Sequence, residues 1–185
     1  MPGGDVRPAS PEDAAGMAQV HVQSWQETYR GLMRDEVLDD PQLLASREKF
    51  WRVLTDPRFS ENRVAVADSD GRIVGIAMSG PATADEPSPW PAQLHVLYLL
   101  RSEHGTGLGP ALLDAVLDPD AGASLWVADP NPRAQAFYRR PGSGRTVSRR
   151  WRRECGTSTW SARPAPADRG LTRRCGGRRA GRDAG

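Results

Sequence analysis

The chain has 185 residues, of which 38% are hydrophobic and 26% are charged, and its formal net charge is +2. This length suggests one domain that can bury a core. No run of about 18 apolar residues predicts a membrane-spanning helix, and the first five residues lack the basic-then-apolar pattern of a signal peptide. A cytoplasmic protein without a membrane partner is therefore expected.

The charge is divided unevenly along the chain. Residues 1–139 carry 12 Lys or Arg and 20 Asp or Glu, whereas residues 140–185 carry 13 Arg and 3 acidic residues. Hydrophobic periodicity is confined to the first part. We therefore expect a folded domain over residues 5–139 and an Arg/Gly/Pro-rich tail over residues 140–185. The only two cysteines, Cys155 and Cys175, have the spacing of neither a zinc site nor a disulfide framework.

The N-terminal half predicts one strand and two helices. Asp5–Pro8 has the pattern of a short strand. Ser10 and Pro11 are typical of a helix start, with Ser as the N-cap and Pro at the first helical position. The residues that follow are apolar at roughly helical spacing, and residues 43–54 have the pattern of a second amphipathic helix.

A hairpin and a third strand come next. Residues 63–67 and 73–78 are rich in apolar and β-branched residues, which predicts two strands. The turn sequence Asp68-Ser69-Asp70-Gly71 separates them. A proline-rich loop over residues 81–91 then leads into the apolar run 94–100, which predicts another strand.

A glycine-rich turn follows this run. The sequence His104-Gly105-Thr106-Gly107-Leu108-Gly109 precedes a helical pattern over residues 111–117. Glycines between a strand and a helix leave backbone N–H groups uncovered at the positive end of the helix dipole, which suits phosphate. Glycines that serve only a positive φ are the alternative. Pro110 and Ala111 stand where a P-loop needs Lys and Ser or Thr, and the glycine interval differs from the Rossmann pattern.

The downstream motifs favour one family. Ser124–Val127 predicts a buried strand, and Asn131–Tyr138 predicts a helix that opens with Asn and Pro. With the glycine-rich turn, these residues resemble the GNAT superfamily of N-acetyltransferases over roughly residues 6–138. The resemblance implies an α/β (α+β) fold, with a mixed, mostly antiparallel sheet flanked by helices. It stops near Arg140, so the last strands are expected to be missing or irregular.

The resemblance also implies the reaction and its cosubstrate. The expected activity is direct acetyl transfer from acetyl-CoA to a primary amine in a ternary complex, with no metal. Backbone groups of Leu99 and Leu100 would meet the acetyl group and pantetheine, and Asn131 would contact pantetheine or cap its helix. The amides expected to bind the pyrophosphate belong to His104, Gly105, Thr106, Gly107, Leu108 and Gly109. The chain departs from the family pattern in two places, since His104 replaces the usual Gln or Arg and Pro110 removes one amide donor.

Catalytic candidates are few. Tyr138 occupies the family position whose hydroxyl protonates the departing thiolate, although Phe137 and Tyr138 also fit simple packing of a helix on a sheet. Gln93 stands where many relatives have a basic Glu, and it cannot accept a proton. His95 lies two residues on, hence on the same strand face, and is the candidate base; a structural role is the alternative.

The acceptor side is expected on the first helix. Residues 21–31 resemble the stretch that walls the acceptor site in similar acetyltransferases, and Trp25 and Tyr29 lie one helical turn apart. Core packing is the favoured role for Trp25, whereas Glu27 and Tyr29 are candidates to meet a polar or cationic substrate.

The tail leaves several interpretations open. It is consistent with a disordered basic extension, a nucleic-acid-binding extension or a shifted reading frame. One allowed choice of codons restores the family's Gly-Phe pair in another frame. The first alternative to catalysis is a degenerate, non-catalytic acyl-CoA-binding protein, and nucleic-acid binding through the tail is weaker. The acceptor is a small-molecule or protein amine, and a homodimer stays open.

Overall fold

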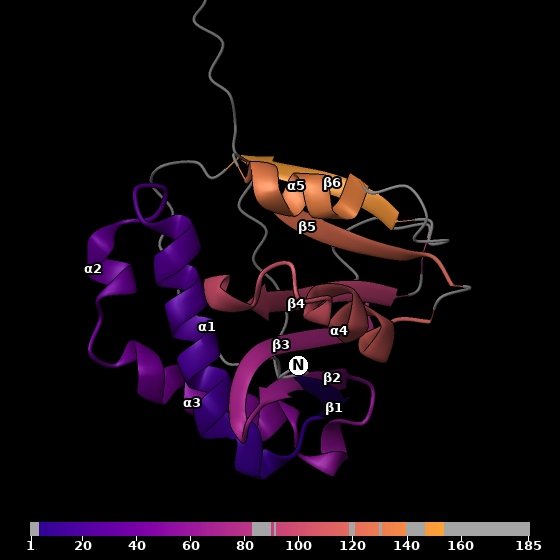
Figure 1. Ribbon diagram of the computed structural model, residues 1–185, viewed down its shortest axis with the longest axis horizontal. Helices are drawn as coiled ribbons and strands as arrows, with labels where there is room; N and C mark the ends of the chain where they lie inside the picture. Colours follow the sequence, from indigo (N-terminus) through magenta and orange to yellow (C-terminus); the bar gives the residue numbers. More distant parts are fainter. Residues whose placement is uncertain are drawn as a thin grey trace, which may run out of the picture.

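The computed structural model describes residues 4–82, 90, 92–118, 121–129, 131–139 and 147–153. Most of the proline-rich loop, both cysteines and most of the tail lie outside these residues. The described part is a six-stranded sheet in the order β1-β2-β3-β4-β5-β6 (Figure 1). The strands are β1 Asp5–Pro8, β2 Arg63–Ser69, β3 Arg72–Pro81, β4 Ala92–Leu99, β5 Ala123–Asp129 and β6 Val147–Arg153.

The sheet is mixed. β1 to β4 are antiparallel neighbours, whereas β5 is parallel to β4 and β6 is parallel to β5. Asp70 and Gly71 both have positive φ, 53° and 79°, at the turn between β2 and β3. The hairpin predicted from that turn sequence is thus confirmed, because two positive φ values match the strand twist. The mixed, mostly antiparallel sheet flanked by helices is likewise confirmed.

Helices cover both faces of the sheet (Figure 1). On one face α1 packs against β3 and β4, and α3 packs against α1, whereas α4 packs on the other face against β1 to β4. The chain enters α1 through a 3-10 turn whose N-cap is Ser10. The helices are η1 Pro11–Asp13, α1 Ala14–Tyr29, α2 Asp35–Leu38, α3 Leu43–Leu54, η2 Pro57–Phe59, η3 Arg101–Glu103, α4 Leu108–Val116 and α5 Pro132–Arg139.

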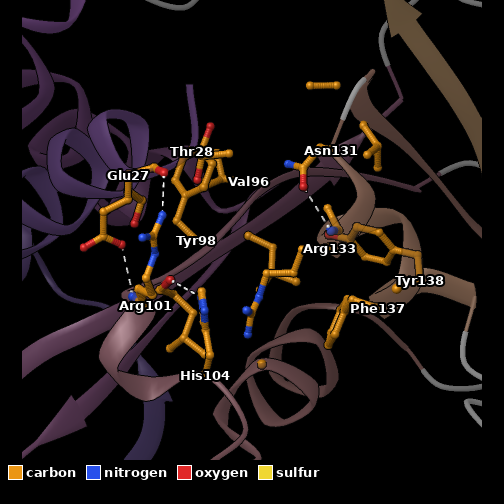
Figure 2. Close-up of a pocket in the computed structure, with 18 of the residues that line it drawn as sticks. Glu27, Thr28, Val96, Tyr98, Arg101, His104, Asn131, Arg133, Phe137 and Tyr138 are labelled. Atoms are coloured by element: carbon orange, nitrogen blue, oxygen red, sulfur yellow. Dashed lines mark hydrogen bonds between the residues drawn. The ribbon is translucent and has the colours of Figure 1, made fainter. Parts of the chain in front are cut away.

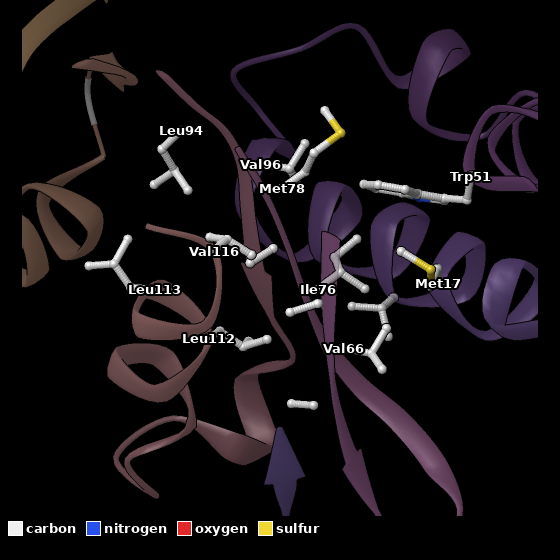
Figure 3. Close-up of a cluster of buried hydrophobic side chains, with 14 of the residues drawn as sticks. Met17, Trp51, Val66, Ile76, Met78, Leu94, Val96, Leu112, Leu113 and Val116 are labelled. Atoms are coloured by element: carbon white, nitrogen blue, oxygen red, sulfur yellow. The ribbon is translucent and has the colours of Figure 1, made fainter. Parts of the chain in front are cut away.

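The core lies on both sides of β3. Met17 of α1 and Trp51 of α3 pack on one side of Ile76, and Leu112 and Val116 of α4 lie on the other (Figure 3). These five side chains are at most 1% exposed. Burying an aliphatic or aromatic side chain of this size contributes about 1.5–3 kcal/mol. The core therefore holds α1 and α4 against β3 and β4. Residues of β4 line the cavity described below.

One strand lies inside the segment expected to be irregular. β6 pairs with β5 from Ala123↔Val147 to Asp129↔Arg153, so the expectation that the last strands are missing or irregular does not hold for residues 147–153. The outer edge of β5 offers unpaired N–H and C=O groups, and backbone pairing at an edge does not need a period-2 side-chain pattern. The boundary at residue 140 and the shifted reading frame stay predictions.

Candidate active site

A split between β4 and β5 creates the main cavity. The two strands pair only at Ala92↔Ala123, Gln93↔Ser124 and Leu94↔Leu125. Just beyond, Val96 pairs with Met78 and Leu94 with Ser79, so His95 is the extra residue of a β-bulge. A bulge bends its strand. Because β4 bends there while β5 runs on, the strands part around a cavity of about 850 Å³.

The cavity brings together most of the predicted site residues. Figure 2 shows Glu27 and Arg101 on one side of it, and Asn131, Phe137 and Tyr138 on the other. The predicted residues that line it are Glu27, Tyr29, His95, Leu99, His104, Gly105, Gly107, Gly109, Asn131 and Tyr138. Those that do not line it are Trp25, Leu100, Thr106 and Leu108.

The glycine-rich turn has the backbone that its glycines permit. Gly105 and Gly107 have φ values of 90° and 93°, and a Cβ on either would meet nothing within 4 Å. The N–H groups of His104 and Thr106 donate to carbonyls of the preceding turn, at 3.2 and 3.4 Å. These two amides were predicted to bind pyrophosphate, and the turn already occupies them. The amides left without a partner in the described chain belong to Gly105, Gly107, Leu108 and Gly109.

Pro110 is not at the first helical position. Gly107 is the N-cap of α4 in the left-handed conformation, so the helix begins at Leu108 and Pro110 is its third residue. The helix therefore begins three residues before the helical pattern predicted over residues 111–117. An N–H at the third position has no partner inside the helix, so the proline breaks no helical hydrogen bond. It does remove one donor from the face that the free amides form.

The backbone of Leu99, and not that of Leu100, faces the cavity. The N–H of Leu100 donates to the carbonyl of Val74 at 3.0 Å, and Leu100 is 3% exposed. The prediction that Leu100 offers its amide to the acetyl group is therefore wrong, because β3 uses that amide. Backbone groups alternate along a strand, so those of Leu99 point away from β3 and into the split.

The side chain of His104 contacts the backbone of Leu99. Its Nε2 lies 3.0 Å from the carbonyl oxygen of Leu99, so the ring donates from Nε2. The other nitrogen, Nδ1, is buried and has no partner in the described chain. Burial lowers the pKa of His104, and the positive charges of Arg133 and Arg101 lower it further, while the Leu99 carbonyl and Glu27 act against them. The imidazole is thus neutral, with an unused acceptor at Nδ1.

Three site residues on or directly before α5 have separate roles, namely Asn131, Phe137 and Tyr138. The Oδ1 of Asn131 accepts from the N–H of Ala134 at 3.1 Å, which confirms its capping role. The ring of Phe137 lies against Gly109, where an added Cβ would be 3.3 Å away, so it packs α5 onto α4. Tyr138 lines the cavity. Burial raises the pKa of its hydroxyl, and nearby Tyr98 raises it further, which keeps that proton in place.

His95 lies at the bulge, on the side of the sheet to which a Gly80 side chain would point. Its Nε2 would be 3.3 Å from a Gly80 Cβ. Gln93 is the register partner of Gly80, so its side chain lies on the same face of the sheet as a Gly80 side chain would. The side chains of Gln93 and His95 therefore share this face, as predicted. Burial lowers the pKa of His95, and the backbone hydrogen bond with Pro81 acts against this effect. A neutral imidazole on the cavity wall can accept a proton.

The end of α1 is tied to the turn before the glycines. Glu27 accepts from the backbone N–H of Arg101 at 3.1 Å and from Gln23 Nε2 at 2.9 Å. The guanidinium of Arg101 donates in return to the carbonyl of Glu27 at 2.9 Å. Trp25 is 5% exposed and belongs to the core. This packing agrees with the favoured role of Trp25 in the core, and Trp25 is not among the described residues that line the cavity.

Sequence reasoning missed several residues that line the cavity, among them Tyr98, Arg101 and Arg133. Tyr98 accepts a hydrogen bond from Trp25 Nε1 at 2.9 Å. In the sequence it stands inside an apolar run that predicts only a buried strand. Arg101 directly follows that run, and a cation between a strand and a glycine-rich turn was the one available signal.

The described residues contain neither a membrane-spanning helix nor a cluster of metal ligands. Among them, no helix is both long and apolar enough to cross a membrane. The same residues contain no group of three or more His, Cys, Asp or Glu side chains that could hold a metal ion.

Comparison with known proteins agrees with this geometry. The chain is 28% identical over 138 residues to a protein of Mycobacterium tuberculosis named a probable N-acetyltransferase, covering 72% of this chain and 75% of that one. It is 41% identical over 102 residues to an uncharacterized N-acetyltransferase of the same organism, covering 52% and 60%.

A solved structure and a family model complete the comparison. The fold is similar to PaiA N-acetyltransferase from Thermoplasma acidophilum in complex with coenzyme A, with a TM-score of 0.56 and 20% identity over 73% of this chain and 86% of that one. The model of the acetyltransferase (GNAT) family matches residues 20–142. The chain therefore belongs to the GNAT family of acetyltransferases.

Proposed function

We propose that this acetyltransferase moves the acetyl group of acetyl-CoA directly to a primary amine, with both substrates bound in the split between β4 and β5. The observation that carries the proposal is the meeting of three elements at one cavity. These are the free amides at the start of α4, the backbone of Leu99 and the hydroxyl of Tyr138. We also place the protein in the cytoplasm.

The residues present fit a coenzyme with a pyrophosphate. The amides of Gly107, Leu108 and Gly109 lie at the N-terminus of α4, where the helix dipole favours an anion. The open space beside Gly105 and Gly107 lets the backbone approach phosphate oxygens. Arg133 lines the same cavity and adds a positive charge. The pyrophosphate would therefore bind at this end, and the thioester would extend along β4 towards Tyr138.

The chemistry follows from this placement. The amine nitrogen attacks the acetyl carbonyl carbon, and the N–H of Leu99 supports the oxygen that becomes negative. The C–S bond then breaks, and the sulfur takes the proton of the Tyr138 hydroxyl. The amine loses one proton, and we assign its acceptance to His95. Its return through water restores Tyr138, so the net products are an N-acetyl amine and coenzyme A with a free thiol.

Two measurements test the proposal. Calorimetric titration with acetyl-CoA reports binding, and release of coenzyme A across a panel of amines reports transfer. Binding with release that depends on an amine supports the proposal. Binding without release from any amine identifies a non-catalytic acyl-CoA-binding protein, and absence of binding at millimolar ligand contradicts the phosphate role of the turn.

Coenzyme binding is expected to depend on pH through His104. Its pKa lies below the usual range in the free protein, and a bound diphosphate would raise it, because the imidazolium offers Nδ1–H to the anion. Protons are then taken up on binding at a pH between the two pKa values. The affinity is highest at low pH and falls as pH rises through the pKa of the bound form.

Calorimetry in two buffers of different ionisation enthalpy measures this proton uptake. The control is His104→Gln, which keeps a polar side chain and cannot titrate. Protonation of the ligand's own phosphates is common to both proteins, so the difference between them belongs to His104. Equal proton uptake by the two proteins would contradict the prediction.

A further inference from the structure

We propose that the acceptor amine also carries a carboxylate, which is bound by Arg47 of α3 and Ser24 of α1. This inference rests on the proposed function, because it names the class of amine that the same cavity accepts. It comes from a group of polar atoms between α1 and α3 that the reaction itself leaves unused.

Buried polar atoms without partners are concentrated at this place. In the part of the chain that the structure describes, seven buried side-chain nitrogen or oxygen atoms have no hydrogen-bond partner, and five of them belong to His21, Ser24, Arg47 and Trp51. Native proteins leave few such atoms unsatisfied, so a cluster calls for a specific cause. Arg47, Trp51 and Ser24 each offer a donor here, and the site therefore favours a ligand rich in acceptors.

Ser24 connects the cluster with the cavity. Its side chain lines the cavity, although the residue is only 4% exposed. Its Oγ has no partner in the described chain. Thr28 lies one helical turn further along α1 and also lines the cavity. A hydroxyl that is buried, unpartnered and on the cavity wall is available to a ligand.

Arg47 supplies the charge. Its guanidinium stacks 5.4 Å from the centre of the Trp25 ring and 5.5 Å from that of Phe50. No acidic side chain pairs with Arg47 among the described residues. Arginine stays protonated in proteins. Arg47 is therefore a half-buried cation, and the described residues give it no counterion. Stacking leaves the edge of the guanidinium, with its N–H groups, free to meet a carboxylate.

The position of Tyr98 places this cation at the acceptor end. Tyr98 lines the cavity, and its ring lies 5.0 Å from the His21 ring on the α1 side. Its phenol is near enough to raise the pKa of Arg47 against the larger, lowering effect of burial. Arg47 stacks on Trp25, whose Nε1 donates to the Tyr98 hydroxyl at 2.9 Å, so Arg47 lies behind Tyr98 on the α1 side of the cavity.

Among the described residues that line the cavity, Glu27 is the only acidic one, and its carboxylate is directed elsewhere. Both carboxylate oxygens of Glu27 are engaged, by Gln23 and by the N–H of Arg101. Figure 2 shows this carboxylate turned towards Arg101. Glu27 therefore does not neutralise Arg47, and a carboxylate on the acceptor is the matching counterion.

Matched acceptors test the inference. We compare phenylalanine with 2-phenylethylamine and leucine with 3-methylbutylamine, each at equal concentration of the deprotonated amine. Because hydrogen bonds to charged groups are strong, kcat/KM is expected to be about 10- to 100-fold higher for the amino acid in each pair. In Arg47→Gln this ratio falls to near one, while kcat/KM for the plain amine and the Kd of acetyl-CoA change less than about twofold.

A second variant guards against misfolding of the first. Ser24→Ala removes an unpartnered hydroxyl and leaves no other group unsatisfied, so it should fold normally and lower the ratio several-fold. Equal activity of the wild type on both members of each pair would overturn the inference, as would a preference that survives in both variants. Binding of the four amines to the coenzyme A complex, measured by calorimetry, gives the same comparison without turnover. Failure of acetyl transfer is thereby separated from failure of carboxylate recognition.

Discussion

Gly107→Asp should abolish the stabilisation of the protein by acetyl-CoA. A ligand that binds only the folded state stabilises it by about 2.7 kcal/mol at 100 times its Kd. Gly107 has a φ of 93° and open space beside it, so an aspartate there would place its carboxylate among the free amides. Repulsion between unit charges about 4 Å apart reaches about 4 kcal/mol near a protein surface. We expect the affinity for acetyl-CoA to fall more than about 100-fold.

Gly71→Asp is the matched control for this experiment. Gly71 also has a positive φ, 79°, and nothing within 4 Å of an added Cβ, but it lies in the β2–β3 turn. Both variants therefore place an aspartate at a positive φ and carry the same added charge. Thermal unfolding with and without acetyl-CoA should show the full ligand-induced shift for Gly71→Asp and none for Gly107→Asp. Loss of the shift in both variants would assign the effect to strain or net charge.

The sequence predicted the elements whose signals are local. The predicted helix over residues 43–54 has the same bounds as α3, since its amphipathic pattern is complete within the segment. The β2–β3 hairpin follows from the turn residues Asp70 and Gly71. The glycine-rich turn was found for the same reason, because positive φ at Gly105 and Gly107 depends on the absence of a side chain.

The errors have non-local causes. The bulge at His95 exists only relative to β3, and it decides where β4 leaves β5. The N–H of Leu100 is occupied because Val74 lies opposite, which the run of leucines does not reveal. β6 forms in an arginine-rich segment because β5 offers a free edge. Arg47 shows the same limit, since α1 and α3 must pack together before its lack of a partner becomes visible.

Tyr138→Phe should lower kcat about 100-fold and leave the Kd of acetyl-CoA nearly unchanged. A positioned general acid contributes about 10²- to 10⁴-fold, and a thiolate that leaves without a proton departs slowly. Burial and Tyr98 raise the pKa of the Tyr138 hydroxyl, so it is protonated across the whole neutral range. A hydroxyl that keeps its proton until a basic sulfur forms beside it is suited to this one step.

If Tyr138 serves only in packing, the expected result for Tyr138→Phe is different. Phenylalanine keeps the ring that stands 5.0 Å from Phe137, so the contact between α5 and α4 remains. If packing were the whole role, kcat and the unfolding temperature would both stay near the wild-type values. If the hydroxyl protonates sulfur, the unfolding temperature stays while kcat falls. The loss should also shrink for acetyl thioesters whose thiol is more acidic, because a better leaving group needs the proton less. A loss of kcat that is independent of the thiol's acidity would remove Tyr138 from the chemical step and leave the departing sulfur to water.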